Sequence, residues 1–224
     1  ETSGTVTITK APLTITANST NWVFDNTEHT DAGFSKTAPV GLQGSDKVNS
    51  INASGAITDV GTCDNVPSGA VVKSGTTDVT ANYEISYVNG TLTVTQSGAL
   101  TANVTSYSGV YDSESHTIAV AASGATGSAA TTISYSTDKT NWITTAPEYK
   151  NVTGGAVTVY VKVTNPNYVT VETSGTVTIT KAPLTITANS HSWTYTSSVH
   201  KDSGYSVSTT DKLQGSDTVS AITV

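Results

Sequence analysis

Several residue types that mark common protein classes are rare in this sequence. It contains one cysteine, Cys63, and no methionine, and only 7% of its residues are aromatic. A single cysteine excludes an intrachain disulfide framework, although it does not exclude secretion. Because only 36% of the residues are hydrophobic, any core must be thin.

Charged residues are also scarce, and the basic ones most of all. The chain carries 10 Lys and Arg against 17 Asp and Glu, which gives a formal net charge of −7 and a pI near 4.8. No basic stripe is present to neutralise phosphates, so no nucleic-acid partner is expected. The sequence also lacks an apolar run of membrane-spanning length, a signal peptide and a lipidation motif, so we expect no membrane insertion of this segment.

Threonine is the commonest residue, at 44 of 224 positions. Threonine and valine dominate the segments that alternate polar and apolar residues, such as Thr-Val-Thr-Ile-Thr at residues 5–9. Alternation with period two is typical of half-buried strands, and β-branched side chains favour a pleated sheet over a helix. These features predict an all-β protein.

A long internal repeat sets the organisation of the chain. Residues 1–19 return without a change at residues 172–190, and the offset of 171 continues without a gap to the last residue. Self-similarity over this length predicts a window from a tandem array.

Fainter matches divide the 171-residue unit into two diverged modules of roughly 85 residues, a size that can hold its own core. For example, Asn82-Tyr83 and Asn167-Tyr168 each precede a Gly-Thr strand motif by eight residues. The expected domains are the last strand of a preceding module (1–10), a complete module (11–96), a second complete module (97–180) and the first half of a further module (181–224).

Local patterns predict the strands and joints of the first complete module. Asn89-Gly90 suits a type I′ turn and predicts a hairpin between the last two strands. Lys10-Ala11-Pro12 should form a stiff joint, whereas the joint at residues 96–99 has glycine in place of proline and should bend more easily. The strands are expected at about residues 20–24, 35–39, 47–53, 70–73, 83–88 and 91–95.

Many short strands with glycine turns indicate a sandwich or a related open barrel. We expect tandem Ig-like or β-grasp-like β-sandwich modules in an elongated array. Both ends of a module must be anchored if the array transmits tension, so its first and last strands should lie side by side and parallel, near the middle of the fold.

A recurring set of an aromatic residue, an acid and a histidine is the most suggestive chemistry in the sequence. Catalysis needs a third convergent group and a pocket, and the third copy has Thr196 in place of the acid. We therefore interpret the set as a structural turn and predict no catalytic residue. No calcium-loop spacing occurs, and we expect no metal or cofactor. The three copies are Phe24, Asp25 and His29; Tyr111, Asp112 and His116; and Tyr195 and His200.

Trp142 offers one possible ligand site. If it is exposed, it could form a sugar-stacking platform with Tyr135 and Tyr149, whereas a tryptophan in the core is the competing interpretation.

Three motifs of the first module form a recognisable set: Lys-Ala-Pro-Leu-Thr-Ile-Thr-Ala at residues 10–17, Gly-Leu-Gln-Gly-Ser-Asp at 41–46 and the closing motif at 82–95. With these motifs the first module resembles the MBG-type repeats of bacterial surface proteins. The likeness covers residues 10–95 and again 181–224. The usual Tyr-Gly before the first turn is replaced by Phe24-Asp25, which marks a divergent member.

The second module carries Tyr111-Asp112 and the segments Tyr-Ser-Thr-Asp at 135–138 and Tyr-Val-Lys-Val-Thr-Asn at 160–165. In these segments it looks like the Ig-like repeats that alternate with MBG-type repeats in large cell-wall-anchored or secreted adhesins of Gram-positive anaerobes. This likeness implies an extracellular, non-catalytic, rod-forming role.

Three functions are consistent with these features. The first is a stalk or spacer of a bacterial surface adhesin, whose partners are the neighbouring repeats. The second is a self-assembling fibre, in which Thr5, Val6, Thr7, Ile8 and Thr9 of one chain complete residues 181–224 of the next by strand addition. The third is a module that binds host glycan, mucin or matrix protein. An enzyme is not expected.

Overall fold

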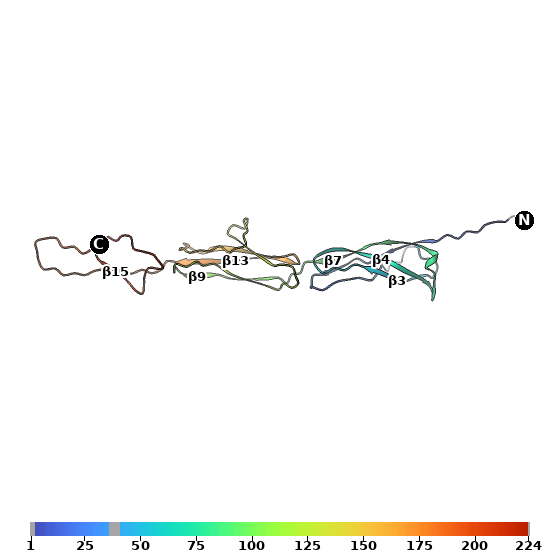
Figure 1. The fold of residues 1–224 in the computed structure, drawn as a ribbon, viewed down its shortest axis with the longest axis horizontal. Helices are drawn as coiled ribbons and strands as arrows, with labels where there is room; N and C mark the ends of the chain where they lie inside the picture. Colours follow the sequence, from blue (N-terminus) through green and yellow to red (C-terminus); the bar gives the residue numbers. More distant parts are fainter. Residues whose placement is uncertain (1–2, 36–40, 224) are drawn as a thin grey trace. The chain divides into compact units, whose positions relative to one another are not determined.

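The computed structural model describes residues 3–35 and 41–223, and its regular structure in these ranges is β-strand apart from one 3-10 turn (Figure 1). The prediction of an all-β fold is therefore confirmed. No helix in the described ranges is long and apolar enough to cross a membrane. The chain divides into two compact units. The first comprises Glu1–Leu100, Gly124–Ala130 and Asn165–Val169, and the second comprises Thr101–Ser123, Thr131–Thr164 and Thr170–Val224.

The elements of the first unit follow the predicted strands closely, except that the segment expected at 70–73 is the end of a much longer strand. Most of the strand expected at 35–39 lies outside the described residues. The elements are β1 (Ala11–Thr16), β2 (Thr20–Val23), β3 (Lys47–Ser54), β4 (Gly61–Ser74), β5 (Thr77–Asp78), the 3-10 turn η1 (Thr80–Asn82), β6 (Tyr83–Val88) and β7 (Gly90–Thr95).

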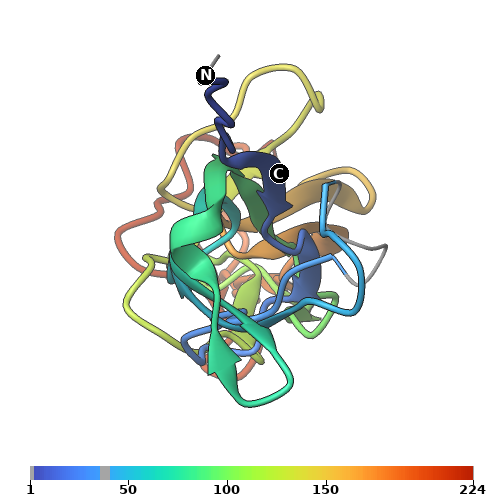
Figure 2. The same cartoon turned by 90° about the vertical axis from the view of Figure 1, so that its right-hand side faces the viewer.

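Two sheets face each other in this unit. One contains β1 and β6, and the other has the strand order β2-β7-β4-β3, with β5 paired to β4. The long strand β4 pairs with β7 through residues 61–65 and with β3 through residues 66–73. Its hairpin into β5 and the turn η1 are seen at the near end in Figure 2.

The first and last stretches of this module run parallel through both sheets. Ala11 lies opposite Tyr83 in the pair β1–β6, and Thr20 lies opposite Leu92 in the pair β2–β7, so paired residues differ by 72 in number in both sheets. The parallel orientation is as predicted, but the first and last strands are not neighbours, because the first strand β1 pairs with β6 and the last strand β7 pairs with β2 in the other sheet. Only the last strand lies inside a sheet, where β7 is held between β2 and β4.

The hairpin predicted at Asn89-Gly90 is wrong. β6 and β7 lie in different sheets and pair with β1 and β2 instead of with each other. Gly90 is needed for another reason: a Cβ atom at this position would come within 2.0 Å of the carbonyl oxygen of Asn18. The chain passes from one sheet to the other twice, between β1 and β2 at Asn18 and between β6 and β7 at Gly90. The glycine allows these two crossing segments to lie in close contact.

Alternate residues of these strands form a thin core, as the alternating sequence predicts. Leu13 and Ile15 are each 1% exposed, and Val72 is fully buried. They pack with Ala70 and Tyr83 in one cluster. Burying each large aliphatic side chain stabilises the unit by about 1.5–3 kcal/mol.

Residues 101–180 form two sheets, one with β10 and β8 and one with the order β11-β12-β13-β9. The closing strand β13 runs parallel to β9, which lies at the edge (Figure 1). A further two-stranded sheet joins β14 to β15. The elements are β8 (Thr101–Thr105), β9 (Tyr107–Val110), β10 (Ala119–Ser123), β11 (Thr132–Ser136), β12 (Val157–Asn165), β13 (Tyr168–Thr180), β14 (Ile186–Ala188) and β15 (Tyr205–Val207).

Strands β12 and β13 supply the core of the second unit. Val159, Val161, Val163 and Val177 have no exposed surface, and Ile179 is 1% exposed. Every second residue of β12 from Val159 is buried, which is the pattern of a strand with one face on the core.

Candidate functional site

The aromatic, acid and histidine set forms a closed loop in the first unit. The His29 ring stacks on Trp22, with centroids 4.7 Å apart and planes at 12°, and its Nε2 lies 3.1 Å from Asp25 Oδ1. The backbone of His29 exchanges two hydrogen bonds with Ile57. Asp25 also accepts hydrogen bonds from the hydroxyl and amide of Thr27, which together with the nearby histidine hold the pKa of this carboxyl below its usual value.

The second unit repeats this arrangement with different aromatic residues. His116 stacks on Tyr107 at 3.9 Å, and its Nε2 lies 2.9 Å from Asp112 Oδ1. In the third copy His200 stacks on Trp193 and bonds to Thr196 Oγ1 at 2.7 Å.

The stacking partner is therefore Trp22, Tyr107 or Trp193, and not the aromatic residue that the sequence pattern selects. In the third copy the histidine bonds to the hydroxyl of Thr196 instead of to a carboxylate. A hydroxyl can hold the loop by a hydrogen bond but cannot act as the acid of an acid–base pair, so the set is better explained as a structural contact that fixes the loop. Within residues 3–35 and 41–223, no group of three or more His, Cys, Asp or Glu side chains could hold a metal ion.

Trp142 belongs to a second cluster, on the outer face of the four-stranded sheet. The Lys162 ammonium lies 4.2 Å from the Trp142 ring centroid and 3.0 Å from Glu172 Oε1. Lys139 lies 4.6 Å from the ring centroid of Tyr160. Such cation–π contacts contribute about 0.5–1 kcal/mol each at exposed sites.

The loop that carries Trp142 is held by Asp138. The carboxylate accepts hydrogen bonds from the amides of Thr140 and Asn141, both at 2.8 Å, and from the side chain of Asn141 at 2.7 Å. These bonds lower the pKa of Asp138 well below its usual range. The Trp142 indole donates to the carbonyl of Lys139 at 3.2 Å, so the ring is fixed over the sheet.

The structure groups Trp142 with Tyr160 and not with Tyr135 or Tyr149. Tyr135 lies opposite the buried Val161 and shares its face of the sheet, whereas Tyr160 and Lys162 point to the other face. Tyr149 pairs through its backbone with His116. The sequence does contain a signal for Tyr160 as the partner of Trp142. Tyr160 alternates with Val159 and Val161 in one strand, so it must lie on the face opposite to these buried valines.

A hollow of about 180 Å³ opens beside this cluster. Lys162 covers one face of the Trp142 ring, so a sugar could stack only on the opposite face of this ring. The hollow is lined by Lys139, Trp142, Tyr160, Glu172, Thr173 and Ser174.

A third cluster lies inside the first unit, around the buried side chain of Asn167. This side chain is 1% exposed. Its Oδ1 accepts a hydrogen bond from the amide of Val60 at 3.0 Å, and its Nδ2 donates to Asp59 Oδ1 at 2.7 Å. These partners are more than 100 residues away in sequence, so no local motif indicates them.

Residues 165–169 are bound to the first unit by further contacts. Ser97 and the 165–169 segment exchange two backbone hydrogen bonds, from the Ser97 amide to the Asn167 carbonyl at 3.0 Å and from the Val169 amide to the Ser97 carbonyl at 2.9 Å. Tyr168 packs edge-on against Phe24, with ring centroids 5.4 Å apart. These contacts join Ser97, in the joint at 96–99, to the 165–169 segment, and the expectation that this joint bends more easily than Lys10-Ala11-Pro12 stays a prediction.

The segment predicted as the last strand of a preceding module is not paired in the described part of the chain. Thr5, Val6, Thr7, Ile8 and Thr9 are all exposed, with Val6 at 92% and Ile8 at 93%. Residues 172–181 repeat residues 1–10, and residues 172–180 form the end of β13, where the equivalent residues Val177 and Ile179 are buried in a strand held between β9 and β12. Tertiary partners therefore decide whether this sequence is a strand.

No protein-family model and no curated protein matches the chain. Among solved structures, the crystal structure of the N-terminal four Ig domains of Dscam1 isoform 4.44 is 14% identical, with a TM-score of 0.31. The match covers 73% of this chain and 44% of that chain.

Proposed function

We propose that this chain is a non-catalytic spacer segment of an extracellular bacterial surface protein of the MBG-type and Ig-like repeat class. The observation that carries the proposal is the parallel pairing of the last strand of each complete module with an early strand of the same module, β7 with β2 and β13 with β9. When neighbouring strands are parallel, the chain enters a module at one end and leaves it at the opposite end. Each tandem copy then adds its full strand length to the reach of the protein.

The strand lengths set this reach. Residues 11–23 and 83–95 each span 13 positions, which at ~3.3 Å per residue gives about 40 Å per module. The same pairing resists tension, because pulling on the two ends shears all the hydrogen bonds between the parallel strands at once instead of opening them one after another. The partners of this segment are then neighbouring repeats of the same protein.

Small-angle scattering of the 224-residue chain over a concentration series tests this proposal. We expect a rod-like profile whose cross-section is that of one module and whose length does not change with concentration. A compact, globular profile would rule out a spacer. Pulling single molecules from the two ends provides a second readout, in which each complete module should unfold in a separate step.

A second candidate is a fibre formed by strand addition between chains, and the exposure of Val6 and Ile8 favours it. The incoming residues 4–9 match residues 90–95 in sequence pattern and would take the place that β7 has in the first module. Sedimentation equilibrium decides: assembly should grow with concentration and disappear in Ile8→Asp, whereas a monomer at high concentration excludes the fibre.

A third candidate, a glycan-binding module, is favoured by the hollow beside Trp142 and Tyr160. Trp142→Ala should abolish binding to immobilised mucin glycans without lowering the melting temperature by more than a few degrees. Retention of binding in this variant would exclude the site.

A further inference from the structure

The turn that begins at the acid of the histidine set holds one residue in the left-handed region of the backbone. Asn26 has a φ of 64° and Ser113 has a φ of 70°. The preceding carboxylate, of Asp25 or Asp112, accepts a hydrogen bond at 2.9 Å from the backbone amide two residues further on and also contacts the histidine. Aspartate stabilises turns by such bonds to the backbone, so the acid and the histidine keep Asn26 and Ser113 in this conformation.

Asn26 faces a glycine of the next module. A Cβ atom at Gly127 would lie 2.6 Å from Asn26 Oδ1 and 3.5 Å from the Phe24 ring. The loop that carries Gly127 is also tied down, because the Thr126 amide donates a hydrogen bond at 2.8 Å to the hydroxyl of Tyr168, whose ring packs against Phe24. The loop and the turn both belong to the first unit. The missing side chain of Gly127 lets the two segments lie in contact.

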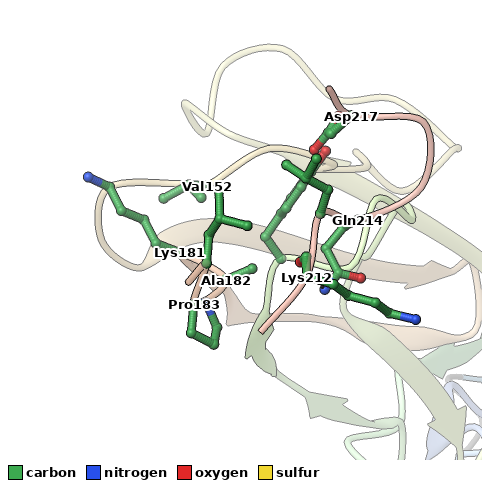
Figure 3. A pocket seen from close by; sticks show the side chains of 10 residues that line it. Val152, Lys181, Ala182, Pro183, Lys212, Gln214 and Asp217 are labelled. Atoms are coloured by element: carbon green, nitrogen blue, oxygen red, sulfur yellow. Dashed lines mark hydrogen bonds between the residues drawn. The ribbon is translucent and has the colours of Figure 1, made fainter. Parts of the chain in front are cut away.

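The same contact recurs within the second unit. A Cβ atom at Gly215 would lie 2.7 Å from Ser113 Cβ. Gly215 lies in a turn closed by a hydrogen bond from the Asp217 amide to the Gln214 carbonyl at 3.0 Å, and the counterpart bond of the first module measures 3.1 Å. Beside this contact, Gln214 and Asp217 face Val152, which belongs to the same module as Ser113 (Figure 3). A turn of one module therefore meets a loop of the next at both joints.

Gly127 and Gly215 occupy the same place in their modules. A Cβ atom at Gly41 or Gly124 would collide with the carbonyl oxygen that precedes the first core leucine of its own module, so these two glycines are equivalent. Gly127 follows Gly124 by three residues, as Gly44 follows Gly41, and Gly215 is the counterpart of Gly44 at the offset of 171. Two unlike modules thus present the same glycine to the turn of the module before them.

We propose that residues 24–26 and 111–113 are docking surfaces for the next module of the array, whose loop approaches through Gly127 or Gly215. The partner that fits is a neighbouring module with glycine at this loop position, because a side chain there would push the two segments apart. The inference rests on the spacer proposal for its partner and deepens it by naming the surface through which the repeats meet. The acid and the histidine then have a role, which is to hold the docking residue in place.

Disulfide trapping in the full 224-residue chain tests this docking. With Cys63→Ser as the background, Asn26→Cys is combined with Gly127→Cys, and Ser113→Cys with Gly215→Cys, and oxidised glutathione is added to the reduced chains. The Cβ atoms of a disulfide lie about 3.5–4.5 Å apart, so positions in contact can be joined after a small adjustment. We therefore expect an intrachain bond in each pair, formed at least about tenfold faster than in a control pair.

The control pair is Asn26→Cys with Gly75→Cys. Gly75 shares the left-handed backbone, with a φ of 60°, and a Cβ atom there would meet nothing within 4 Å among the described residues. It follows the end of β4 that lies away from β7, so its cysteine is out of reach of residue 26. In the chain with Asn26→Cys and Gly127→Cys, Asp25→Ala should slow trapping at least about fivefold, because the turn loses the carboxylate that fixes it.

Circular dichroism checks the fold of each reduced chain, and if one joint pair does not fold, the other pair decides. Equal trapping rates in the joint and control pairs would overturn the docking surface. A trapping rate that Asp25→Ala leaves unchanged would overturn the role of the acid. A rod-like scattering profile without trapping refutes docking and keeps the spacer proposal, whereas trapping in a chain with a compact profile refutes the spacer proposal alone.

Discussion

The buried side chain of Asn167 allows a quantitative prediction. Asn167→Ala removes the hydrogen bonds to Val60 and Asp59 and leaves a half-buried amide without its acceptor. The bond to a neutral amide contributes about 1 kcal/mol and the bond to a carboxylate about 1.5–3 kcal/mol. Because Asp59 is exposed and can be rehydrated, we expect a net loss of about 2 kcal/mol.

Hydrogen exchange followed by mass spectrometry measures this loss locally. A loss of about 2 kcal/mol corresponds to roughly 30-fold faster exchange in peptides that contain Val60 and Ser97, whose amides bond to Asn167. Asn82 supplies a matched control, because it precedes Tyr83 as Asn167 precedes Tyr168 but is exposed. Asn82→Ala should change exchange in these peptides by less than about twofold.

A third variant separates the two bonds. Asn167→Asp keeps an acceptor for the Val60 amide but places a buried carboxylate beside Asp59, so it should destabilise the segment at neutral pH and recover once the pH is low enough to protonate the new carboxyl group. The reasoning is refuted if Asn167→Ala changes exchange no more than Asn82→Ala does.

Three further predictions follow from the strands and their turns. Ile179→Ala should cost about 2–5 kcal/mol in urea unfolding of the second unit, whereas Ile8→Ala, in the identical ten-residue sequence, should stay within about 0.5 kcal/mol; equal effects would contradict the assigned burial. Gly90→Ala should lower the melting temperature of the first unit sharply because its Cβ would collide with the Asn18 carbonyl, while an unchanged melting temperature would exclude the crossing. The hydrogen bond from Thr20 lowers the pKa of Asp31, so its stabilisation is complete above the unfolded pKa of about 3.9 and is lost as the pH falls through the lower folded value. Asp31→Asn should flatten the acid limb of a stability–pH curve below about pH 4, and an unchanged limb would show that Asp31 does not contribute.

Much of the fold could be predicted from the sequence because its signals are local. Alternation of threonine with valine, leucine or isoleucine identifies strands such as β7 and β13, since the period-two pattern reflects one face on the core. The 171-residue repeat predicts that residues 181–223 resemble the first module, and their hydrogen bonds do match. The recurring histidine was interpreted as a structural turn, and its stacked and bonded geometry fits that interpretation.

Pairing over long sequence distances could not be predicted, because no local pattern encodes the identity of a distant partner. Asn89-Gly90 has the letters of a hairpin turn, yet the contact with Asn18 makes it a crossing between two sheets. Trp142 meets Lys162 and Tyr160 only because the sheet presents those side chains on the face that the loop covers.

The repeated ten-residue sequence at the start of the chain and at the end of β13 separates the two contributions most clearly. The sequence alone determined that Val6 and Val177 occupy equivalent places in an alternating, strand-forming segment. Only the tertiary structure decided that Val177 is buried and Val6 is exposed. The hydrophobic effect acts on the surface that neighbouring strands remove from water, and β9 and β12 are present beside one copy and not beside the other within the described residues.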